Sequence, residues 1–373
     1  MSDGAPASVR VLHFVTGGFG GGATQVAIAL VTAAMQTPAV QPLLVLRRKR
    51  HTDPARVAEL VAAGIPVRVV PGGFHWLTAL RVARICREFQ PQVLVAHGFP
   101  EHIIGRHAGR LARVPQMVHV EHNTRERYTW WRLLQARWLA RITARIVGCS
   151  EGVKQRLLEL GFPADRVQAI PNGIRLAPFE AADRHPHEGR EAAIIMCARF
   201  ARQKDHRLLL RAIAQLRDRG LTPPVLFAGG GKKSHRRSAE RLVQRLGLES
   251  QVRFLGLIRN VPEVLMQQRI FALITHWEGM PLALVEGMAA GCAVVGSDAP
   301  GVREVIQDGI NGHLAPVNDP MALADILERL LREPDHAARL GARARRDAID
   351  RHSLELMNQR YESLFLELAR AAA

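Results

Sequence analysis

At 373 residues, with 47% hydrophobic residues and a formal charge of +17, the chain is long enough for two globular domains of ordinary size. It has no unbroken apolar run of about 18 residues, and its N-terminal stretch leads straight into an apolar segment, so we expect neither a membrane span nor a signal peptide and predict a cytoplasmic protein. The four cysteines are widely spaced without a CxxC pair, which argues against a zinc site and favours reduced thiols in the core.

The positive charge is concentrated in the first part of the chain. Residues 1–150 contain 19 Lys and Arg against 7 Asp and Glu, so they carry +12 of the +17. This imbalance favours an acidic partner, and phosphates, anionic lipid headgroups and nucleic acid all qualify.

The first half of the chain alternates short apolar runs with amphipathic stretches, the rhythm of a doubly wound parallel sheet. We predict strands at 9–15, 42–47, 67–70, 93–98, 117–123, 145–150 and 167–171. Residues 1–175 are therefore predicted to form a Rossmann-like domain.

The rhythm stops across residues 175–191, which are polar, contain two prolines and have no periodicity, as is typical of an interdomain linker. A second series of predicted strands follows at 192–200, 224–231, 252–256, 271–276, 292–298 and 312–317. We therefore predict an α/β fold of two Rossmann-like domains facing one another across a cleft, the second at 190–352. Residues 353–373 are predicted to form a helix that packs back on the first domain.

Each half has a glycine-rich turn after an early strand. In the first turn, Gly18, Gly20 and Ala23 satisfy the looser dinucleotide pattern, but the basic residues Arg47–Arg50 occupy the place where a ribose-binding acid is needed. A nicotinamide enzyme is therefore disfavoured. The second turn, in residues 228–237, lacks the Gly-Lys-Ser/Thr ending of a P-loop, which excludes an ATPase of that kind.

Two glutamates, Glu278 and Glu286, lie eight residues apart on either side of Pro281, where a predicted strand turns into a predicted helix. Proline suits a first helical turn because its missing N–H would have no intrahelical acceptor there. Ligands of open α/β sheets bind beyond the carboxyl ends of the strands. Carboxylates there would repel a phosphate but would accept hydrogen bonds from hydroxyls, so the pair indicates a ligand with a sugar part.

Basic residues suited to a diphosphate occur in the segment CARFARQKDH. Arg199 lies at a predicted strand end, and Lys204 lies at the start of the next predicted helix. A guanidinium and an ammonium together would neutralise a departing nucleoside diphosphate as its charge develops. The alternative is that both are solvated charges at a helix start.

These motifs together resemble one family. The E-x7-E pair, the RFARQK block at 199–204, the PNGI turn at 171–174, the GGG turn and the GVREVIQDGINGHL segment at 301–314 are similar to those of retaining nucleotide-sugar glycosyltransferases of family 4, which have the GT-B fold. The resemblance covers nearly the whole chain and is strongest from Ser150 to Asp319.

The resemblance implies a role for each matching residue. Glu278 would hold the transferred sugar and Glu286 the ribose, while Arg199 and Lys204 would hold the diphosphate. His122 matches a family histidine near the donor and acceptor phosphates. Four residues would line the sugar with their backbone amides: Gly279, Met280, Pro281 and Leu282. Two glycines, Gly21 and Gly22, would close the donor site from the other domain.

The family mechanism needs no metal clamp, and the chain contains no Asp-x-Asp sequence, so we predict metal independence and no cofactor. From the resemblance we expect a UDP-sugar as the donor, although the residues themselves do not name the base. Such enzymes retain anomeric configuration, with the departing diphosphate oxygen helping to deprotonate the acceptor. We assign no carboxylate nucleophile. His97, at the end of a predicted strand, is a second candidate near the acceptor; for His97 and His122 alike the alternative is a structural role.

The acceptor is expected on the N-terminal half, where residues 124–145 are rich in Arg and Trp. If the segment is one helix, it carries a basic stripe of Arg137, Arg141 and Arg145 and a neighbouring face of Trp131, Trp138 and Ile142. This combination suits an anionic membrane surface. The alternatives are an aromatic face buried against the sheet, or a nucleic-acid partner, although no RNA- or DNA-binding module is recognisable.

The sequence thus predicts a cytoplasmic hexosyltransferase, peripheral on the inner membrane face, that builds lipopolysaccharide, capsule or another lipid-linked glycan. Two alternatives stay open: a sugar-nucleotide 2-epimerase of the same fold, which needs no acceptor, and a nucleotide-sugar binding protein without turnover.

Overall fold

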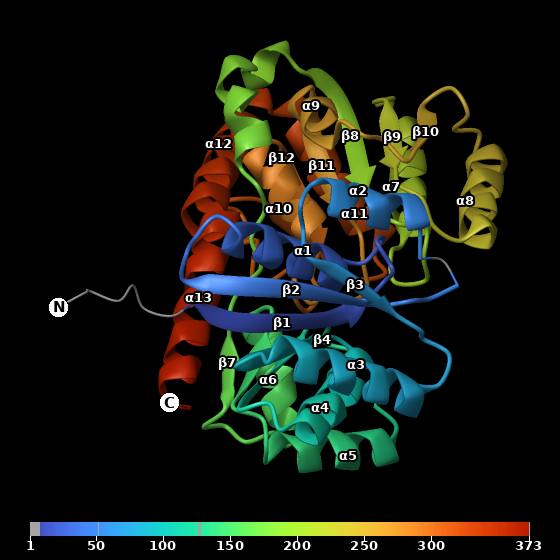
Figure 1. Ribbon diagram of the computed structural model, residues 1–373. Coiled ribbons are helices and arrows are strands. Elements are labelled where there is room, and N and C mark those ends of the chain that lie inside the picture. The colour runs from blue at the N-terminus through green and yellow to red at the C-terminus, as the bar shows by residue number, and fades with distance from the viewer. Residues whose placement is uncertain (1–7, 51, 126–127, 373) are drawn as a thin grey trace. The chain divides into compact units, whose positions relative to one another are not determined.

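The computed structural model describes residues 8–50, 52–125 and 128–372 (Figure 1). The chain divides into two compact units, Met1–Asn172 with Leu354–Ala373, and Gly173–Ser353. Each unit is an α/β structure built on one parallel sheet.

The first unit contains, in its described part, a seven-stranded sheet in the order β3-β2-β1-β4-β5-β6-β7, with every neighbouring pair parallel. Its strands are β1 Val9–Thr16, β2 Val40–Arg47, β3 Val67–Val70, β4 Val93–His97, β5 Gln116–Glu121, β6 Arg145–Gly148 and β7 Val167–Ala169. Its helices are α1 Gly22–Ala34, α2 Pro54–Ala62, α3 His75–Phe89, α4 Glu101–Ala112, α5 Trp130–Ala140, α6 Glu151–Glu159 and α13 Leu354–Arg370.

The second unit has a parallel sheet in the order β10-β9-β8-β11-β12-β13. Its strands are β8 Glu191–Cys197, β9 Val225–Ala228, β10 Val252–Gly256, β11 Gln268–Leu273, β12 Ala293–Ser297 and β13 His313–Ala315. Its helices are η1 Ala177–Arg184, η2 His187–Gly189, α7 His206–Asp218, α8 Lys233–Leu246, α9 Val261–Met266, α10 Leu282–Ala289, α11 Pro320–Arg332 and α12 Pro334–Arg351.

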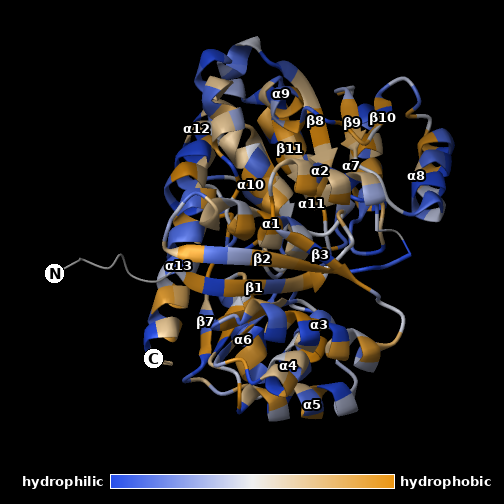
Figure 2. Ribbon diagram, in the orientation of Figure 1, coloured by the Kyte–Doolittle hydropathy of each residue, from blue (hydrophilic) through white to orange (hydrophobic). Residues whose placement is uncertain are grey.

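The apolar runs predicted as strands all form strands of these two sheets, so the predicted α/β class and the two Rossmann-like sheets are confirmed. The central strands are mostly apolar because helices cover both faces of a parallel sheet (Figure 2). The four cysteines are buried free thiols, as predicted.

Strand order changes direction once in each sheet, between β1 and β4 in the first and between β8 and β11 in the second. At such a switch point the connections that follow two neighbouring strands lead to opposite faces of the sheet. This leaves a crevice for a ligand beyond the carboxyl ends of the strands. The loops after these four strands are therefore the first places to look for a site.

Helix α13 belongs to the first unit although it follows the second unit in sequence. It contacts α1, β1 and β4. Its buried face consists of Met357, Tyr361, Leu364, Phe365 and Leu368, which join one core cluster with apolar side chains of β1, β4 and β5.

The segment predicted as a linker, residues 175–191, is more ordered than expected. It forms the 3₁₀ helices η1 and η2 and packs within the second unit, where Phe179 is buried. Arg345 of α12 pairs with Asp183 at 2.9 Å and donates to the Phe179 carbonyl. These long-range contacts, which composition does not reveal, fix a polar segment that has no periodicity.

The predicted helical stripe through Arg145 is wrong, because α5 ends at Ala140 and Arg145 begins β6. Two arginines satisfy the carbonyls where α5 ends. Buried Arg106 of α4 reaches the Ala136 carbonyl, and Arg166 donates to the carbonyls of Ala140 and Arg141. Donors at a helix C-terminus satisfy carbonyls that lack intrahelical partners, so the fold stops this helix where sequence periodicity continues.

Candidate active site

The switch point of the second sheet brings together two of the residues predicted to bind the donor. Lys204 lies in the loop after β8, and Glu278 lies in the loop after β11; the Lys204 ammonium forms an ion pair with Glu278 Oε1. The two loops are held together by backbone bonds, since Asp205 N–H donates to the Ile274 carbonyl and His276 N–H donates to the Gln203 carbonyl. The pair is largely buried, with 13% of the Lys204 side chain and 10% of the Glu278 side chain exposed.

Further contacts fix the position of the Glu278 carboxylate. Thr275 Oγ1 donates to Glu278 Oε1 at 2.7 Å, and the Thr275 N–H donates to Ser297 Oγ at 2.9 Å. The Glu278 N–H donates to the Pro300 carbonyl at 3.0 Å. Gly301 has φ of +81°, and a β-carbon there would lie 2.6 Å from the Glu278 carbonyl oxygen, so a glycine is needed for this close approach.

The four backbone amides predicted to line the sugar are not equivalent, and this prediction needs correction. Pro281 has no N–H, and the Leu282 N–H donates to the Met280 carbonyl at 3.0 Å. Only the N–H groups of Gly279 and Met280, two buried residues, have no acceptor among the described residues. Because buried N–H groups are almost always bonded, these two are the amides of the turn that could bind a ligand oxygen.

Glu286 lies on α10, one turn after the helix begins at Leu282. Burial raises the pKa of its carboxyl from 4.5 to about 7. Burial also raises the pKa of the Cys197 thiol to about 12, and the Glu286 charge contributes to that shift. Because Cys197 is the last residue of β8, this electrostatic contact places Glu286 near the end of β8, at the same switch point as Lys204 and Glu278.

Arg199, also predicted to bind the diphosphate, is exposed in the loop after β8 and pairs with no carboxylate of the described residues. The GGG turn supports this loop. The Phe200 N–H donates to the Gly230 carbonyl at 2.7 Å, and a β-carbon on Gly229 would lie 2.2 Å from the Ala198 carbonyl oxygen. The second glycine-rich turn therefore holds the arginine loop in place.

The switch point of the first sheet contains the other glycine-rich turn, between β1 and α1. A β-carbon on Gly17 would lie 2.8 Å from the Arg47 carbonyl oxygen, so packing explains that glycine. In contrast, β-carbons on Gly20 or Gly22 would meet nothing within 4 Å, and one on Gly21 would be 3.7 Å from its nearest neighbour. Packing within the unit does not require glycine at these three positions, which are open to a ligand.

His97 and His122, both predicted as candidates near the acceptor, lie in a row with a third histidine, His13 of β1. His122 Nε2 is 3.3 Å from His97 Nδ1, and His97 Nε2 is 3.1 Å from His13 Nδ1. Burial is the largest cause that lowers each pKa, to about 3 for His13 and about 4 for His122, and well below the ordinary value for His97, where the charges of His13, His122 and His119 contribute further.

The row is therefore neutral at physiological pH, and each ring has one nitrogen that can donate and one that can accept. The tautomer of His13 then determines that of His97, which determines whether His122 Nδ1 carries a proton. His122 Nδ1 is buried without a hydrogen-bond partner in the described structure. Whether this nitrogen donates or accepts a hydrogen bond therefore depends on the tautomers of His97 and His13.

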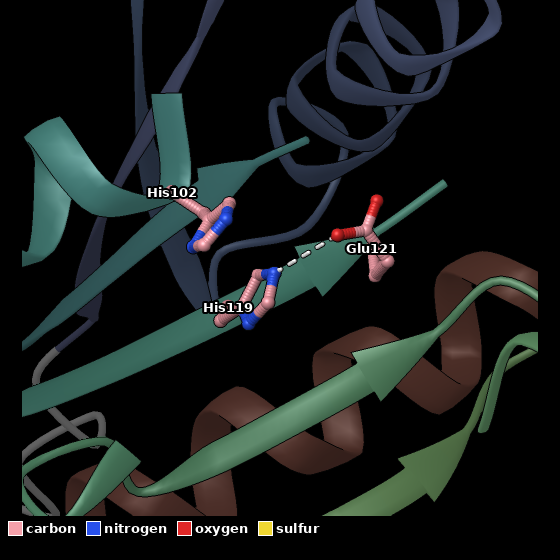
Figure 3. Close-up of side chains that lie close together, drawn as sticks. All are labelled: His102, His119 and Glu121. Carbon is pink, nitrogen blue, oxygen red and sulfur yellow. Dashed lines mark ion pairs between the residues drawn. The ribbon is translucent and has the colours of Figure 1, made fainter. Parts of the chain in front are cut away.

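A second polar cluster in the first unit has the composition of a metal site: His102, His119 and Glu121 (Figure 3). Its geometry does not suit one. The two imidazoles are stacked, with centroids 3.9 Å apart and planes only 16° apart, so no single cation could lie in the planes of both rings. His102 Nδ1 also lies 2.6 Å from the guanidinium of buried Arg106, whose charge would repel a cation. Metal independence of the reaction stays a prediction.

Sequence reasoning missed the residues that position the candidate site. Thr275 follows β11 and Ser297 is the last residue of β12, so the signal for both was a polar residue at the end of an apolar run. His13 stands in the apolar run of β1, where an isolated polar residue is itself a signal. Arg47 was considered only as a basic residue at the place of a ribose-binding acid, but it forms a buried ion pair with Glu101 at 2.8 Å.

Comparisons with known families agree with this geometry. The family described as Glycosyltransferase Family 4 matches residues 20–177, and the family described as Glycosyl transferases group 1 matches residues 179–347. Both units are therefore glycosyltransferase domains.

Two curated relatives carry related glycosyltransferase names. EpsD of Bacillus subtilis (strain 168), named as a glycosyltransferase, is 28% identical over 223 residues, which cover 57% of this chain and 58% of EpsD. The UDP-Gal:alpha-D-GlcNAc-diphosphoundecaprenol alpha-1,3-galactosyltransferase of Escherichia coli is 24% identical over 263 residues, which cover 66% of this chain and 68% of the relative. The chain thus spans less than two thirds of EpsD.

The fold of these glycosyltransferase domains is that of solved GT-B enzymes. The structure of Anabaena Alr3699/HepE in complex with UDP and glucose has a TM-score of 0.82 at 20% identity, covering 96% of this chain and all of that chain. The matched domains and the named relatives support a transferase. None of the described helices is both long and apolar enough to cross a membrane.

Proposed function

We propose that the chain is a retaining glycosyltransferase that moves a hexose from a nucleotide-sugar, a UDP-sugar, to a lipid-linked or polysaccharide acceptor in bacterial cell-surface glycan synthesis, including lipopolysaccharide and capsule. The observation that carries this proposal is the Lys204–Glu278 pair at the switch point of the second sheet, with Glu286 beside the end of β8. This arrangement puts a cation for phosphate next to carboxylates for hydroxyls.

The named relatives support this choice of substrates. The E. coli relative is named for UDP-Gal and a diphosphoundecaprenol-linked acceptor, and the HepE structure holds UDP and glucose. By analogy, we assign a UDP-sugar to the second unit and a lipid-linked acceptor to the first, whose residues carry most of the positive charge.

In the proposed reaction, Glu278 and the amides of Gly279 and Met280 bind the hydroxyls of the sugar, and Glu286 binds the ribose. Arg199 and Lys204 stabilise the diphosphate as the bond between the anomeric carbon and the phosphate oxygen breaks. The acceptor oxygen bonds to the same face of that carbon, and its proton passes to the departing diphosphate. No carboxylate nucleophile is needed, and Glu278 is already engaged by Lys204 and Thr275.

We further propose that the protein works in the cytoplasm, peripheral on the inner membrane face. The aromatic side chains of the Arg- and Trp-rich segment support this, because they are not buried against the sheet: Trp131 is 66% exposed and Trp138 41% exposed. Exposed tryptophans beside arginines suit the interfacial region of an anionic membrane.

The test of the proposed function uses a panel of UDP-, GDP- and ADP-sugars with and without alpha-D-GlcNAc-diphosphoundecaprenol, followed by detection of released nucleoside diphosphate. Transfer that needs the acceptor, with the anomeric configuration of the donor kept in the product by NMR, supports a retaining transferase. Conversion of the donor without any acceptor would instead show an epimerase. Donor binding without product, with and without this acceptor, would favour a binding protein.

A further inference from the structure

A groove of about 760 Å³ lies within the first unit, between α3, α4 and α5. Its volume falls in the range of about 300–1,000 Å³ that is typical of pockets for small molecules. Its lining consists of His75, Trp76, Ala79, Leu80, Phe99, Pro100, Ile103, Ile104, His107, Arg110, Leu111, Arg132 and Gln135. None of these residues is acidic.

Most of the residues that line the groove are apolar. On α4, Ile104 and Leu111 share one face because they are seven residues apart, close to two helical turns, and Ile103 lines the groove beside Ile104. Across from them on α3, Trp76 and Leu80 are 64% and 47% exposed. Several large apolar side chains next to one another and in contact with solvent are uncommon on a soluble surface and indicate a binding surface.

One end of the groove lies at the carboxyl edge of the first sheet. Phe99 and Pro100 line it and follow His97, the last residue of β4, by two and three residues. From there the groove runs along α4 to Leu111. It therefore begins at the edge that also carries the open glycine turn and His122, and leads away from it.

Arg132 carries the positive charge among the residues that line this end, and the neighbouring Glu101 is already paired with Arg47 at 2.8 Å. The Arg132 guanidinium lies 5.1 Å from the centre of the Phe99 ring and forms no ion pair with a carboxylate of the described residues. Arg110, at the far end of α4, lies 4.7 Å from the centre of the Trp138 ring. Aromatic contacts hold both guanidinium groups and leave their N–H donors available to an anion.

We propose that this groove binds the apolar chain of a phosphorylated lipid acceptor, with Arg132 binding its phosphate at the end near His97. The proposal deepens the proposed function and rests on it for the identity of the acceptor. The chain would run along α4 towards Leu111. In this orientation the phosphate, and the sugar attached to it, lie at the edge of the sheet where ligands of α/β folds bind.

The binding test uses the full chain and single-chain alkyl phosphates by titration calorimetry. Octyl phosphate and decyl phosphate should both bind, with decyl phosphate tighter by about tenfold because two more methylenes are buried. Inorganic phosphate should bind far more weakly than either. Equal affinity for decyl phosphate and decyl maltoside would overturn the proposal, because it would show an apolar surface without phosphate recognition.

Matched variants test the orientation. Arg132→Ala should weaken decyl phosphate binding about tenfold or more, since a hydrogen bond to a charged group is lost. Arg110→Ala, at the far end of the same groove, should change it by less than about threefold. Loss of affinity that is equal in the two variants would overturn the placement of the phosphate.

A second pair of variants tests the apolar contact. Leu80→Glu puts a carboxylate in the groove at an exposed position and should abolish binding of decyl phosphate, while Val61→Glu, at a 57% exposed position on α2, should leave it unchanged. Binding of UDP-glucose is measured in parallel. Wild-type protein that binds UDP-glucose but not decyl phosphate would refute lipid binding in the groove and leave the proposed function standing. Protein that binds neither UDP-glucose nor any other nucleotide-sugar would refute the proposed function itself.

Discussion

The carboxyl group of Glu286 should release a proton when a nucleotide-sugar binds. Burial raises its pKa to about 7 in the folded chain, so about half of the molecules carry a neutral Glu286 at pH 7. Hydroxyl groups of a ribose would donate to the ionised form and lower that pKa again. If it returns to the ordinary value of 4.5, binding releases about 0.9 proton at pH 6, about 0.5 at pH 7 and less than about 0.1 at pH 8.

The same linkage makes donor affinity depend on pH. Between pH 8 and pH 6 the affinity of the wild type should fall about tenfold, because the proton on Glu286 must first be removed. Glu286→Gln, which cannot titrate, should show no such dependence. UDP-glucose is a suitable probe because both of its phosphates are esterified and neither titrates in this range.

Titration calorimetry in phosphate and in Tris buffer measures the released protons directly, since the two buffers differ in their enthalpy of ionisation. The difference between wild type and Glu286→Gln isolates this carboxyl from the histidines. Equal proton release by the two proteins between pH 6 and pH 8 would refute the assignment of Glu286 to the ribose.

Without a ligand, the raised pKa of Glu286 should make the folded chain less stable as the pH rises, whereas donor affinity rises with pH. The folded pKa of Glu286 is higher than the unfolded one, so its contribution is fully present below about pH 4.5 and is lost as the pH rises through 7. The free energy of unfolding of the wild type should therefore fall relative to Glu286→Gln from pH 5 to pH 8, by at most roughly 3 kcal/mol. Denaturant titrations at the two pH values measure this difference.

Other predictions address the remaining parts of the site. Lys204→Ala should lower turnover about 10²–10³-fold and affect donor affinity less, because the ammonium stabilises charge that develops on the leaving group; a change in KM alone would contradict this role. Gly22→Val should leave the melting temperature unchanged, since the space beside Gly22 is open, but should weaken UDP-glucose binding at least about tenfold. Chelation of divalent metal with EDTA should leave transfer unchanged, and a loss restored by Mg²⁺ would refute metal independence. Trp131→Ser with Arg141→Glu should reduce sedimentation with anionic vesicles, as raised salt should, whereas Arg241→Glu on the second unit should not.

The elements of the fold could be predicted because their signal is local. A strand buried on both faces is an apolar run, and each run that was predicted as a strand contains one. The end of α5 could not be predicted, because Arg166, which satisfies its last carbonyls, comes 26 residues after Ala140. The linker segment was misinterpreted for the same reason, since its partner Arg345 is far away in sequence.

The candidate site was predictable in its charged residues and not in their partners. Glu278 and Lys204 were selected by type and by their place after strands, and the structure joins them in an ion pair. The histidine row depends on the pairing of β1 with β4 and β4 with β5, which brings His13 of β1, His97 of β4 and His122, directly after β5, into line. Sequence spacing carries no information about such a line, nor about which amide of a turn is already bonded.

The place of α13 in the first core has a consequence for synthesis of the protein on the ribosome. The second unit is continuous in sequence, so all of its residues are present once residue 353 has been made. The first unit, although made earlier, lacks Met357, Tyr361 and Phe365 until the end, and its apolar surface on β1 and β4 stays uncovered during that time. At about 5–20 residues per second, translation of the 181 residues between the two parts takes roughly 10–40 seconds. During that interval the earlier-made segment exposes the kind of surface that chaperones bind. The second unit therefore has all of its residues before the first unit does, whereas in most multidomain proteins the N-terminal domain folds first.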